Sequence, residues 1–271
     1  MSKIPPLQSL LDIFERAALL TGDPILHIYR AGPDARYKSD ASPVTDADER
    51  AEAIILTRLA TECPGIPVVA EESAAAGRIP DVEGKPFLLV DPLDGTKEFI
   101  NGNDDFTVNI ALIDKGIPVL GFVYAPALGL AYRGSPEGAE KLWVDTNFQV
   151  TRRQPMRARA LASPDIAVTS RWSRCAQTDA FINHSGASDI RTVGSSLKFC
   201  LIAEGAADIY PRFGRTMEWD TAAGDAILRA AGGMTFDLDG HPLTYGKTGR
   251  PDCADFANPD FVARCSGNKA R

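Results

Sequence analysis

The sequence contains few cysteines, and their arrangement is not typical of a disulfide or zinc framework. The five cysteines are odd in number and widely spaced, and none forms a CxxC pair. A disulfide-rich secreted domain and a cysteine-ligated zinc site are therefore excluded, and we expect a reducing compartment. Histidine is also scarce, with three residues that all fall outside the motifs described below, so we assign no catalytic role to histidine.

Excess basic charge and long apolar runs are absent as well. The formal net charge is -7 and the pI is near 5.1, which argues against non-specific binding of nucleic acid. No stretch approaches the roughly 20 apolar residues that span a bilayer, and the N-terminal residues do not have the pattern of a cleaved signal. We expect a cytoplasmic protein without a transmembrane segment. Peripheral association with the inner membrane and the oligomeric state are not decided by these features.

The pattern of apolar residues indicates an α/β protein in two parts. The chain is 44% hydrophobic and 24% charged, as in soluble globular proteins. Helical periodicity in the first 60 residues, two short buried strands and a β-rich run at 107–144 that reads as an antiparallel meander predict an α+β half over residues 1–148. Strands alternating with helices at 195–204 and 220–231 predict an α/β half over residues 149–271.

The most informative segment is Asp91-Pro92-Leu93-Asp94-Gly95-Thr96, directly after the apolar run 87–90. Two aspartates separated by a proline turn can face one point, with the Leu93 carbonyl between them, and oxygen ligands of this kind suit Mg²⁺. Gly95 and Thr96 can begin a helical turn whose N–H groups face an anion. For this motif alone, an ordinary Asx turn is the simpler explanation.

Three further segments supply acids. Glu71 and Glu72 follow the apolar run 67–70, where adjacent buried carboxylates need a cation or a donor. Asp220 has the position of a helix N-cap, and Asp48 forms a capping box with Thr45. Taken singly, Asp220 and Asp48 read as capping residues.

Together these segments resemble a known signature. Glu71-Glu72-Ser73, DPLDGT from Asp91 and WDTAAG from Trp219, preceded by Val44-Thr45-x-Ala47-Asp48, are similar in type and order to the inositol monophosphatase superfamily. The extended forms DPLDGTKEFI, GSSLKFCLIAEGAADIYPRFG and WDTAAGDAIL resemble its CysQ-type bisphosphate nucleotidase branch. The resemblance runs from about residue 10 to Asn258-Pro259, which is nearly the whole chain.

The resemblance implies a layered α/β/α/β/α sandwich and a phosphatase that uses two Mg²⁺ ions, with a third, weaker site beside Asp48. It assigns the metal ligands as Glu71, Asp91, the Leu93 carbonyl, Asp94 and Asp220, with Asp91 bridging. It assigns catalytic roles to Glu71, Thr96, Asp94 and Asp48. Water oriented by Glu71 and Thr96 attacks the phosphate, and the predicted substrate contacts are Leu93, Asp94, Gly95, Thr96, Ser195, Ser196, Lys198, Arg212 and Asp220.

The second half carries the expectation about substrate. Ser195, Ser196 and Lys198 place hydroxyls and an ammonium at a helix start, and Arg212 follows a strand, which forms a clamp for a 5'-phosphate. Solvated Lys and Arg side chains are the plain alternative without the resemblance. Relatives often carry a His shortly after Ser170-Arg171, where this chain has Trp172-Ser173. Trp172 is a candidate to stack on adenine.

The expected activity is hydrolysis of the 3'-phosphate of adenosine 3',5'-bisphosphate, with 3'-phosphoadenylyl sulfate as a further candidate substrate. Lithium sensitivity and a place in sulfur assimilation come with the resemblance. An inositol or sugar phosphatase with the same metal chemistry is the main alternative, because fold and ligands do not set the substrate. An inactive metal- or nucleotide-binding regulator is the second alternative, and the presence of every expected ligand speaks against it.

Overall fold

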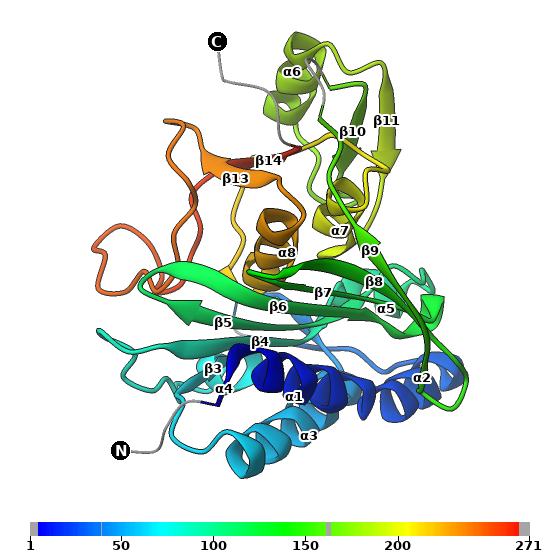
Figure 1. The fold of residues 1–271 in the computed structure, drawn as a ribbon, viewed down its shortest axis with the longest axis vertical. Coiled ribbons are helices and arrows are strands. Elements are labelled where there is room, and N and C mark those ends of the chain that lie inside the picture. The colour runs from blue at the N-terminus through cyan, green and yellow to red at the C-terminus, as the bar shows by residue number, and fades with distance from the viewer. Residues whose placement is uncertain (1–4, 39, 161–163, 266–271) are drawn as a thin grey trace.

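A computed structural model of the chain describes residues 5–38, 40–160 and 164–265. Its elements stack in five layers of helices, sheet, helices, sheet and helix, as Figure 1 shows from bottom to top. The expected α/β/α/β/α sandwich is therefore confirmed. The site described below lies between the two sheets, at the start of a helix in the middle layer.

The first sheet has seven strands in sequential order. Its first two strands are parallel, and all later neighbours are antiparallel, so the expected meander is confirmed. A short 3₁₀ helix, η1 (Pro126–Leu128), connects two of the strands. The strands are β3 (Val68–Ala70), β4 (Phe87–Asp94), β5 (Thr107–Asp114), β6 (Ile117–Ala125), β7 (Leu130–Ser135), β8 (Gly138–Val144) and β9 (Val150–Met156).

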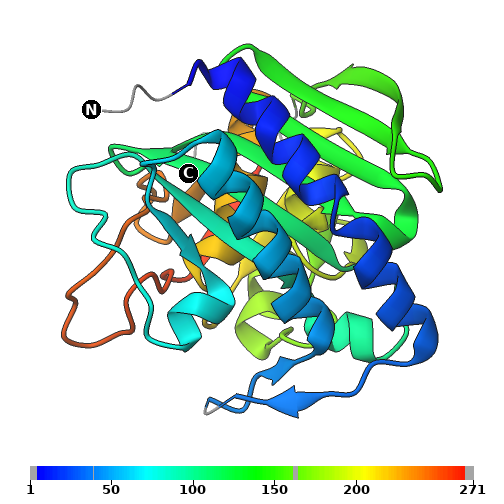
Figure 2. The same cartoon turned by 90° about the horizontal axis from the view of Figure 1, so that it is seen from below.

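Amphipathic helices cover the outer face of this sheet. Apolar side chains such as Leu10, Phe14 and Ile55 recur at helical spacing and are fully buried against it. Thr45 caps the third helix by accepting from the backbone N–H of Ala47, and the expected capping box is present. Figure 2 shows two of these helices crossing the sheet from below. The outer helices are α1 (Leu7–Leu19), α2 (Gly22–Ala31) and α3 (Asp46–Glu62).

The middle layer holds two helices packed closely on the first sheet. A Cβ added at Gly121 in β6 would lie 2.2 Å from the carbonyl oxygen of Ala223, so only glycine admits the helix this near. The second sheet has the order β11-β10-β12-β14-β13, with α6 (Ala176–Ser185) outside it. The remaining elements here are α7 (Leu197–Ala203), α8 (Glu218–Ala230), β10 (Ile166–Thr169), β11 (Asp189–Thr192), β12 (Ile209–Arg212), β13 (Met234–Asp237) and β14 (Phe261–Arg264).

The passage between the sheets lies later than the expected division after residue 148. β9 follows that point, yet it pairs antiparallel with β8 in the first sheet. The chain reaches the second sheet only at Ile166. The reason is that the polar, Arg- and Pro-rich stretch 149–165 is typical of a boundary between halves, although its first part forms an exposed edge strand, where such residues are tolerated.

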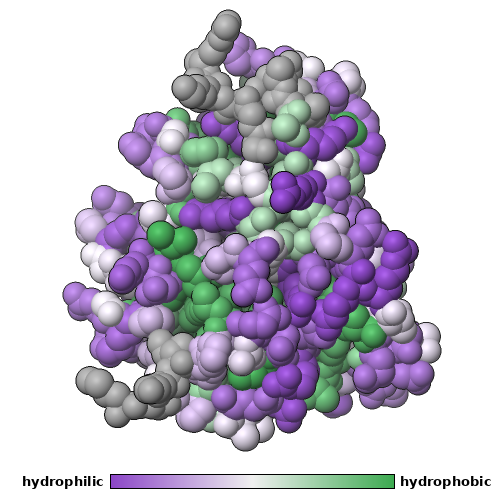
Figure 3. Space-filling view, in the orientation of Figure 1, coloured by the Kyte–Doolittle hydropathy of each residue, from purple (hydrophilic) through white to green (hydrophobic). Residues whose placement is uncertain are grey.

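Most of the surface is hydrophilic in the view of Figure 3, with hydrophobic residues showing only in smaller areas. Among the described residues, no helix combines the length and apolar character needed to cross a bilayer. A small hairpin of β1 (Arg36–Tyr37) and β2 (Pro43–Val44) and the short helices α4 (Glu71–Ala75) and α5 (Thr96–Ile100) lie beside the site.

Candidate active site

Two parallel strands deliver the first acids. β3 and β4 run side by side in register, with Ala70 opposite Val90. The next residue of each strand is therefore an acid at the same edge of the sheet, namely Glu71 at the start of α4 and Asp91 within β4. Residues at the carboxyl ends of parallel strands commonly form sites in this way.

The Asp91–Asp94 segment is an irregular part of β4 rather than a separate turn. The pairing with β5 shifts register between Asp91 and Asp94, and the backbone N–H of Leu93 donates to Asp91 Oδ1 at 3.0 Å. Gly95 then has φ +94°, a conformation that favours glycine. α5 begins at Thr96, which confirms the expected helical turn.

Asp220 comes to the site from α8 and is not its N-cap. The helix begins at Glu218, so Asp220 is its third residue, and its Oδ2 accepts from the backbone N–H of Met217 at 2.9 Å. The sequence-based interpretation placed the N-cap three residues too late, because the WDT motif has the form of a cap. The carboxylate still satisfies a free N–H of the first turn.

The acids form one buried, mutually repelling cluster. The pKa of Asp91 is raised well above its usual value by burial first and then by the charges of Glu71, Asp94 and Asp220. The pKa of Asp220 is raised well above its usual value by burial and then by Asp94 and Glu71. Burial also raises the pKa of Asp94, although the Lys198 charge and the Asn109 amide oppose this. Ionised together, these groups require additional positive charge.

The side chains present supply only part of that charge. Lys38 Nζ donates to Glu71 Oε1 at 2.8 Å and to Glu72 Oε1 at 2.6 Å. Lys198 acts on Asp94 only through its charge, and Arg212 acts on Asp220 in the same way. The cluster consists of oxygen atoms that can ligate a metal at the edge of a sheet. The positively charged side chains around it are too few to balance its acids. This arrangement fits hard divalent cations such as Mg²⁺.

Asp48 joins a capping role to a contact with the site. Its Oδ2 accepts from the backbone N–H and the hydroxyl of Thr45, at 2.8 and 2.7 Å. Its Oδ1 accepts from the Thr96 hydroxyl at 3.2 Å, and that hydroxyl also lies 3.3 Å from the Leu93 carbonyl oxygen. Burial raises the pKa of Asp48 to about 6. The capping and the catalytic interpretations thus apply to different oxygens of one carboxylate.

The two serines of the second half are used differently. Ser195 has φ +50°, and its Oγ is buried without a hydrogen-bond partner in the described part of the chain. Ser196 Oγ donates to the Asp220 carbonyl at 2.6 Å and accepts from Asn109 Nδ2 at 3.0 Å. These internal bonds engage the Ser196 hydroxyl, and Ser196 is not among the residues that line the cavity, so its substrate contact stays a prediction.

The two cations of the expected clamp also differ. Lys198 is 4% exposed, and its ammonium donates to the carbonyls of Ser195 at 2.6 Å and Val193 at 3.2 Å. Burial lowers its pKa to about 8. Arg212 donates one bond from Nη2 to the Arg215 carbonyl at 3.1 Å, and its Nε is buried without a partner among the described residues. Arg212 therefore retains more donor capacity for a ligand.

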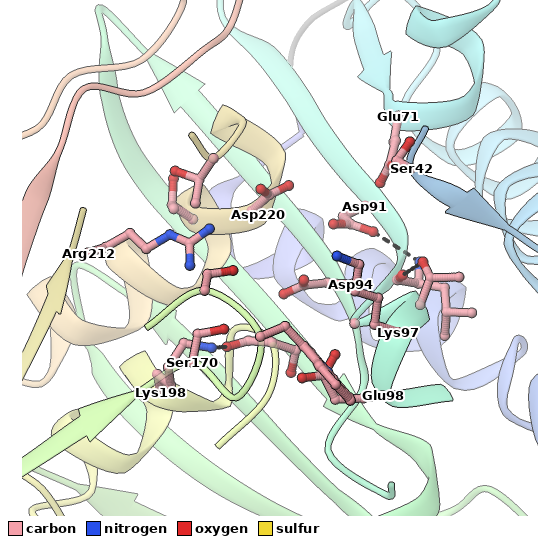
Figure 4. A pocket seen from close by; sticks show the side chains of 18 of the residues that line it. Ser42, Glu71, Asp91, Asp94, Lys97, Glu98, Ser170, Lys198, Arg212 and Asp220 are labelled. Carbon is pink, nitrogen blue, oxygen red and sulfur yellow. Dashed lines mark hydrogen bonds between the residues drawn. The ribbon is translucent and has the colours of Figure 1, made fainter. Parts of the chain in front are cut away.

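These side chains surround one cavity of about 320 Å³. Figure 4 shows Glu71, Asp91, Asp94 and Asp220 around a common space into which Arg212 also points. Asp48 lies behind Thr96 and, like Ser196, is not part of the lining. The predicted residues that do line the cavity are Glu71, Asp91, Leu93, Asp94, Gly95, Thr96, Ser195, Lys198, Arg212 and Asp220.

Besides lining residues such as Ser42, Thr216 and Thr221, the sequence analysis missed two residues that bond the acids of the site. Asn109 in β5 donates to Asp94 Oδ2 at 3.3 Å and bonds Ser196, and its only sequence signal is an amide within the apolar run 107–113. Lys38 follows a two-residue strand without periodicity, so nothing in the sequence marked its contact with Glu71.

Comparison with known proteins agrees with the fold. The model of the inositol monophosphatase family matches residues 7–263. The chain belongs to the inositol monophosphatase family. An Escherichia coli O157:H7 relative of this family, the 3'(2'),5'-bisphosphate nucleotidase CysQ, is 43% identical over 254 residues, which are 93% of this chain and 98% of the relative.

Solved structures of the family have the same fold. The CysQ structure from Bacteroides thetaiotaomicron has a TM-score of 0.77 and 36% identity, covering 97% of this chain and 99% of that one. A Thermotoga maritima IMPase has a TM-score of 0.74 at 24% identity, covering 94% and 92%. The second likeness supports the fold alone. Both the sequence relative and the first structure are CysQ proteins, in line with the resemblance of the extended motifs.

Proposed function

We propose that this protein hydrolyses the 3'-phosphate of adenosine 3',5'-bisphosphate to give AMP and phosphate, in a reaction that requires Mg²⁺. One observation carries the proposal: a single cavity has a cluster of acids on one side and, on the other, Arg212 with unused donor capacity. Such a cavity can hold a reacting phosphate and a second, remote phosphate. The name of the Escherichia coli relative, a 3'(2'),5'-bisphosphate nucleotidase, supports this substrate class.

The ligand sets follow the resemblance. Glu71, Asp91 and the Leu93 carbonyl would hold one Mg²⁺, and Asp91, Asp94 and Asp220 a second. Asp48 would lie near a third, weaker ion. When bound, Mg²⁺ neutralises phosphate charge and lowers the pKa of water.

Thr96 and Asp48 can orient the attacking water. While the Thr96 hydroxyl donates its proton to Asp48 Oδ1 at 3.2 Å, its oxygen can accept a hydrogen bond from water in the cavity. Glu71, which also lines the cavity, can accept the other water proton and act as the base. The capping bonds on Asp48 Oδ2 fix the carboxylate and thereby hold its Oδ1 as an acceptor for the Thr96 hydroxyl.

The remaining residues position the substrate. The start of α5, with Gly95 left-handed before Thr96, presents backbone N–H groups to the reacting phosphate. Arg212 engages the 5'-phosphate by charge-assisted hydrogen bonds. Lys198 holds the loop that ends in Ser195 and adds positive charge to that side of the cavity. 3'-Phosphoadenylyl sulfate has the same 3'-phosphate and is a further candidate substrate.

Initial rates with Mg²⁺ test the proposal. We expect kcat/KM to be highest for adenosine 3',5'-bisphosphate and lower for inositol 1-phosphate and fructose 1,6-bisphosphate. A clear preference for inositol 1-phosphate would instead assign the chain to the inositol phosphatases of its family. Absence of turnover on all three substrates with Mg²⁺ present would favour a binding protein.

A further inference from the structure

Trp172 is the one large apolar side chain that both lines the cavity and is well exposed among the described residues. It is 47% exposed and lies in the segment between β10 and α6, next to Ser170 and Ser173, which also line the cavity. Single exposed apolar residues elsewhere on a surface are ordinary. An exposed aromatic face at the rim of a cavity for an organic phosphate is different, because it can cover an apolar part of the ligand.

Residues on both sides of Trp172 form ion pairs. Arg171 donates from Nη1 to Asp105 Oδ1 at 3.1 Å, and its Nη2 lies 3.0 Å from Asp105 Oδ2. This ion pair connects the second half of the chain to the first. Asp105 Oδ2 also accepts from the backbone N–H of Gly194 at 2.5 Å. On the other side, Arg174 pairs with Asp179 in α6. The segment is therefore held by charged pairs, while its tryptophan is left uncovered.

The same aspartate ties this segment to the loop of the phosphate clamp. Gly194 precedes Ser195, so the bond to Asp105 fixes the start of that loop with respect to Arg171. A Cβ at Gly194 would lie 2.5 Å from the Asp105 carbonyl oxygen, which shows how closely the two segments pack. The neighbour of Trp172 in the chain is thus bonded to the same aspartate as the loop proposed to hold the phosphates.

We propose that Trp172 stacks on the purine base of the substrate and so selects nucleoside bisphosphates over phosphorylated ligands without a base. The inference rests on the proposed function and names the residue that recognises the nucleoside. A purine is flat and has an apolar face that an indole can cover, whereas the inositol ring and free ribose carry hydroxyls around a puckered ring. Stacking of this kind contributes about 1–3 kcal/mol per base.

Two substrates that differ only in the base test this role. We expect Trp172→Ala to lower kcat/KM for adenosine 3',5'-bisphosphate roughly tenfold or more. The fall should be much smaller for ribose 3,5-bisphosphate, and Trp172→Phe should recover most of the loss because it restores an aromatic face. Leu238→Ala is the matched control, because this side chain is 55% exposed and does not line the cavity. Equal losses on both substrates, or no loss on the nucleotide, would overturn the inference.

A binding measurement separates this inference from the proposed function. AMP with Mg²⁺ should quench the tryptophan fluorescence of the wild type, and the quench should be absent in Trp172→Phe, although Trp143 and Trp219 remain. A quench that persists in the variant contradicts stacking on Trp172. If the wild type does not hydrolyse adenosine 3',5'-bisphosphate, the proposed function fails. If it does, and Trp172→Ala matches it, only the role of Trp172 fails.

Discussion

The two sides of the cavity satisfy their charges in different ways. The carboxylate wall consists of the buried Asp91 and the partly buried Glu71, Asp94 and Asp220, and burial and mutual repulsion raise the pKa values of Asp91 and Asp220. The cationic wall, formed by Ser195, Lys198 and Arg212, is largely satisfied within the protein, because Lys198 donates to two carbonyls.

The contrast shows which wall depends on a ligand for its stability. The carboxylate wall loses stability when its acids are ionised without cations, since burial and mutual repulsion both disfavour the charged forms. The Lys198 side of the cationic wall is bonded without substrate, and among the described residues the buried Arg212 Nε and Ser195 hydroxyl have no partner. We therefore expect the first wall to control turnover and the second to control substrate preference.

Removal of metal should have the largest effect. Excess EDTA should reduce turnover to the background rate, and added Mg²⁺ should restore it, because the carboxylate wall has no other source of sufficient positive charge. Initial rates on adenosine 3',5'-bisphosphate measure this. Turnover that persists in EDTA would show that the carboxylate wall acts without cations.

Substitution of Asp91 should separate stability from activity. Loss of a residue that only hydrogen-bonds a metal ligand typically costs roughly 10–100-fold in activity. Asp91→Asn should lower kcat by more than this. In EDTA it should raise the Tm, by about 2–4 °C for each kcal/mol gained. The reason is that the variant removes a fully buried charge from a repelling cluster. Thermal unfolding with and without Mg²⁺ measures both states.

The difference in stability between wild type and Asp91→Asn should depend on pH. Because the folded-state pKa of Asp91 is raised, its contribution to stability is greatest at low pH and is lost as pH rises through that pKa. Metal-free wild type should therefore gain stability relative to Asp91→Asn as the pH falls through that raised pKa. Asp252→Asn, at an exposed position, is the control and should change neither Tm nor kcat. A Tm in EDTA that is lower for Asp91→Asn than for wild type would contradict the repulsion.

Substitution of Arg212 should affect substrates unequally. Charge-assisted contacts contribute about 1.5–3 kcal/mol, so Arg212→Ala should lower kcat/KM for adenosine 3',5'-bisphosphate roughly ten- to a hundredfold. The loss should be much smaller for inositol 1-phosphate, which has no second phosphate. Arg191→Ala is the control, since Arg191 is exposed on β11 and does not line the cavity. Equal losses on both substrates would place Arg212 in support of the carboxylate wall.

The ammonium of Lys198, in the cationic wall, should make kcat/KM depend on pH. Burial lowers its pKa to about 8, so it is charged below that pH and becomes neutral above it. We expect kcat/KM for adenosine 3',5'-bisphosphate to fall as the pH rises through about 8, by roughly severalfold. Lys198→Arg should lose this fall, because guanidinium stays charged. An identical fall for inositol 1-phosphate would point to another group.

The sequence predicted the carboxylate wall better than the cationic wall. Each acid of the first wall follows a local signal, either the end of an apolar run or the start of a helix, and Glu71, Asp91, Asp94 and Asp220 all line the cavity. The contacts that were missed join distant positions. Lys38 reaches Glu71 across 33 residues and Asn109 reaches Ser196 across 87, and no local pattern encodes such pairs.

Local sequence patterns also do not show which partner a polar side chain bonds. Ser195-Ser196-Lys198 reads as three ligands at a helix start, yet a helix start equally needs its side chains for internal bonds. Ser195 lines the cavity with a φ of +50°, and the preceding Gly194 N–H is bonded to Asp105 in the first half, which no local pattern encodes. The assignment of ligands to the two metals and the roles of the clamp residues stay predictions.

The smallest effects should come from the paired variants Ser195→Ala and Ser196→Ala, which compare neighbouring hydroxyls. Ser196→Ala removes bonds to Asn109 and to the Asp220 carbonyl and should lower the free energy of unfolding by about 1–3 kcal/mol, since it leaves buried groups unpaired. Its KM should change little, because the hydroxyl is engaged in bonds within the protein.

Ser195→Ala removes a hydroxyl that has no partner among the described residues, so its stability should match the wild type, while kcat/KM should fall by a factor of a few. Thermal unfolding and initial rates on both variants decide the matter, and a KM increase confined to Ser196→Ala would restore that serine to the substrate contacts.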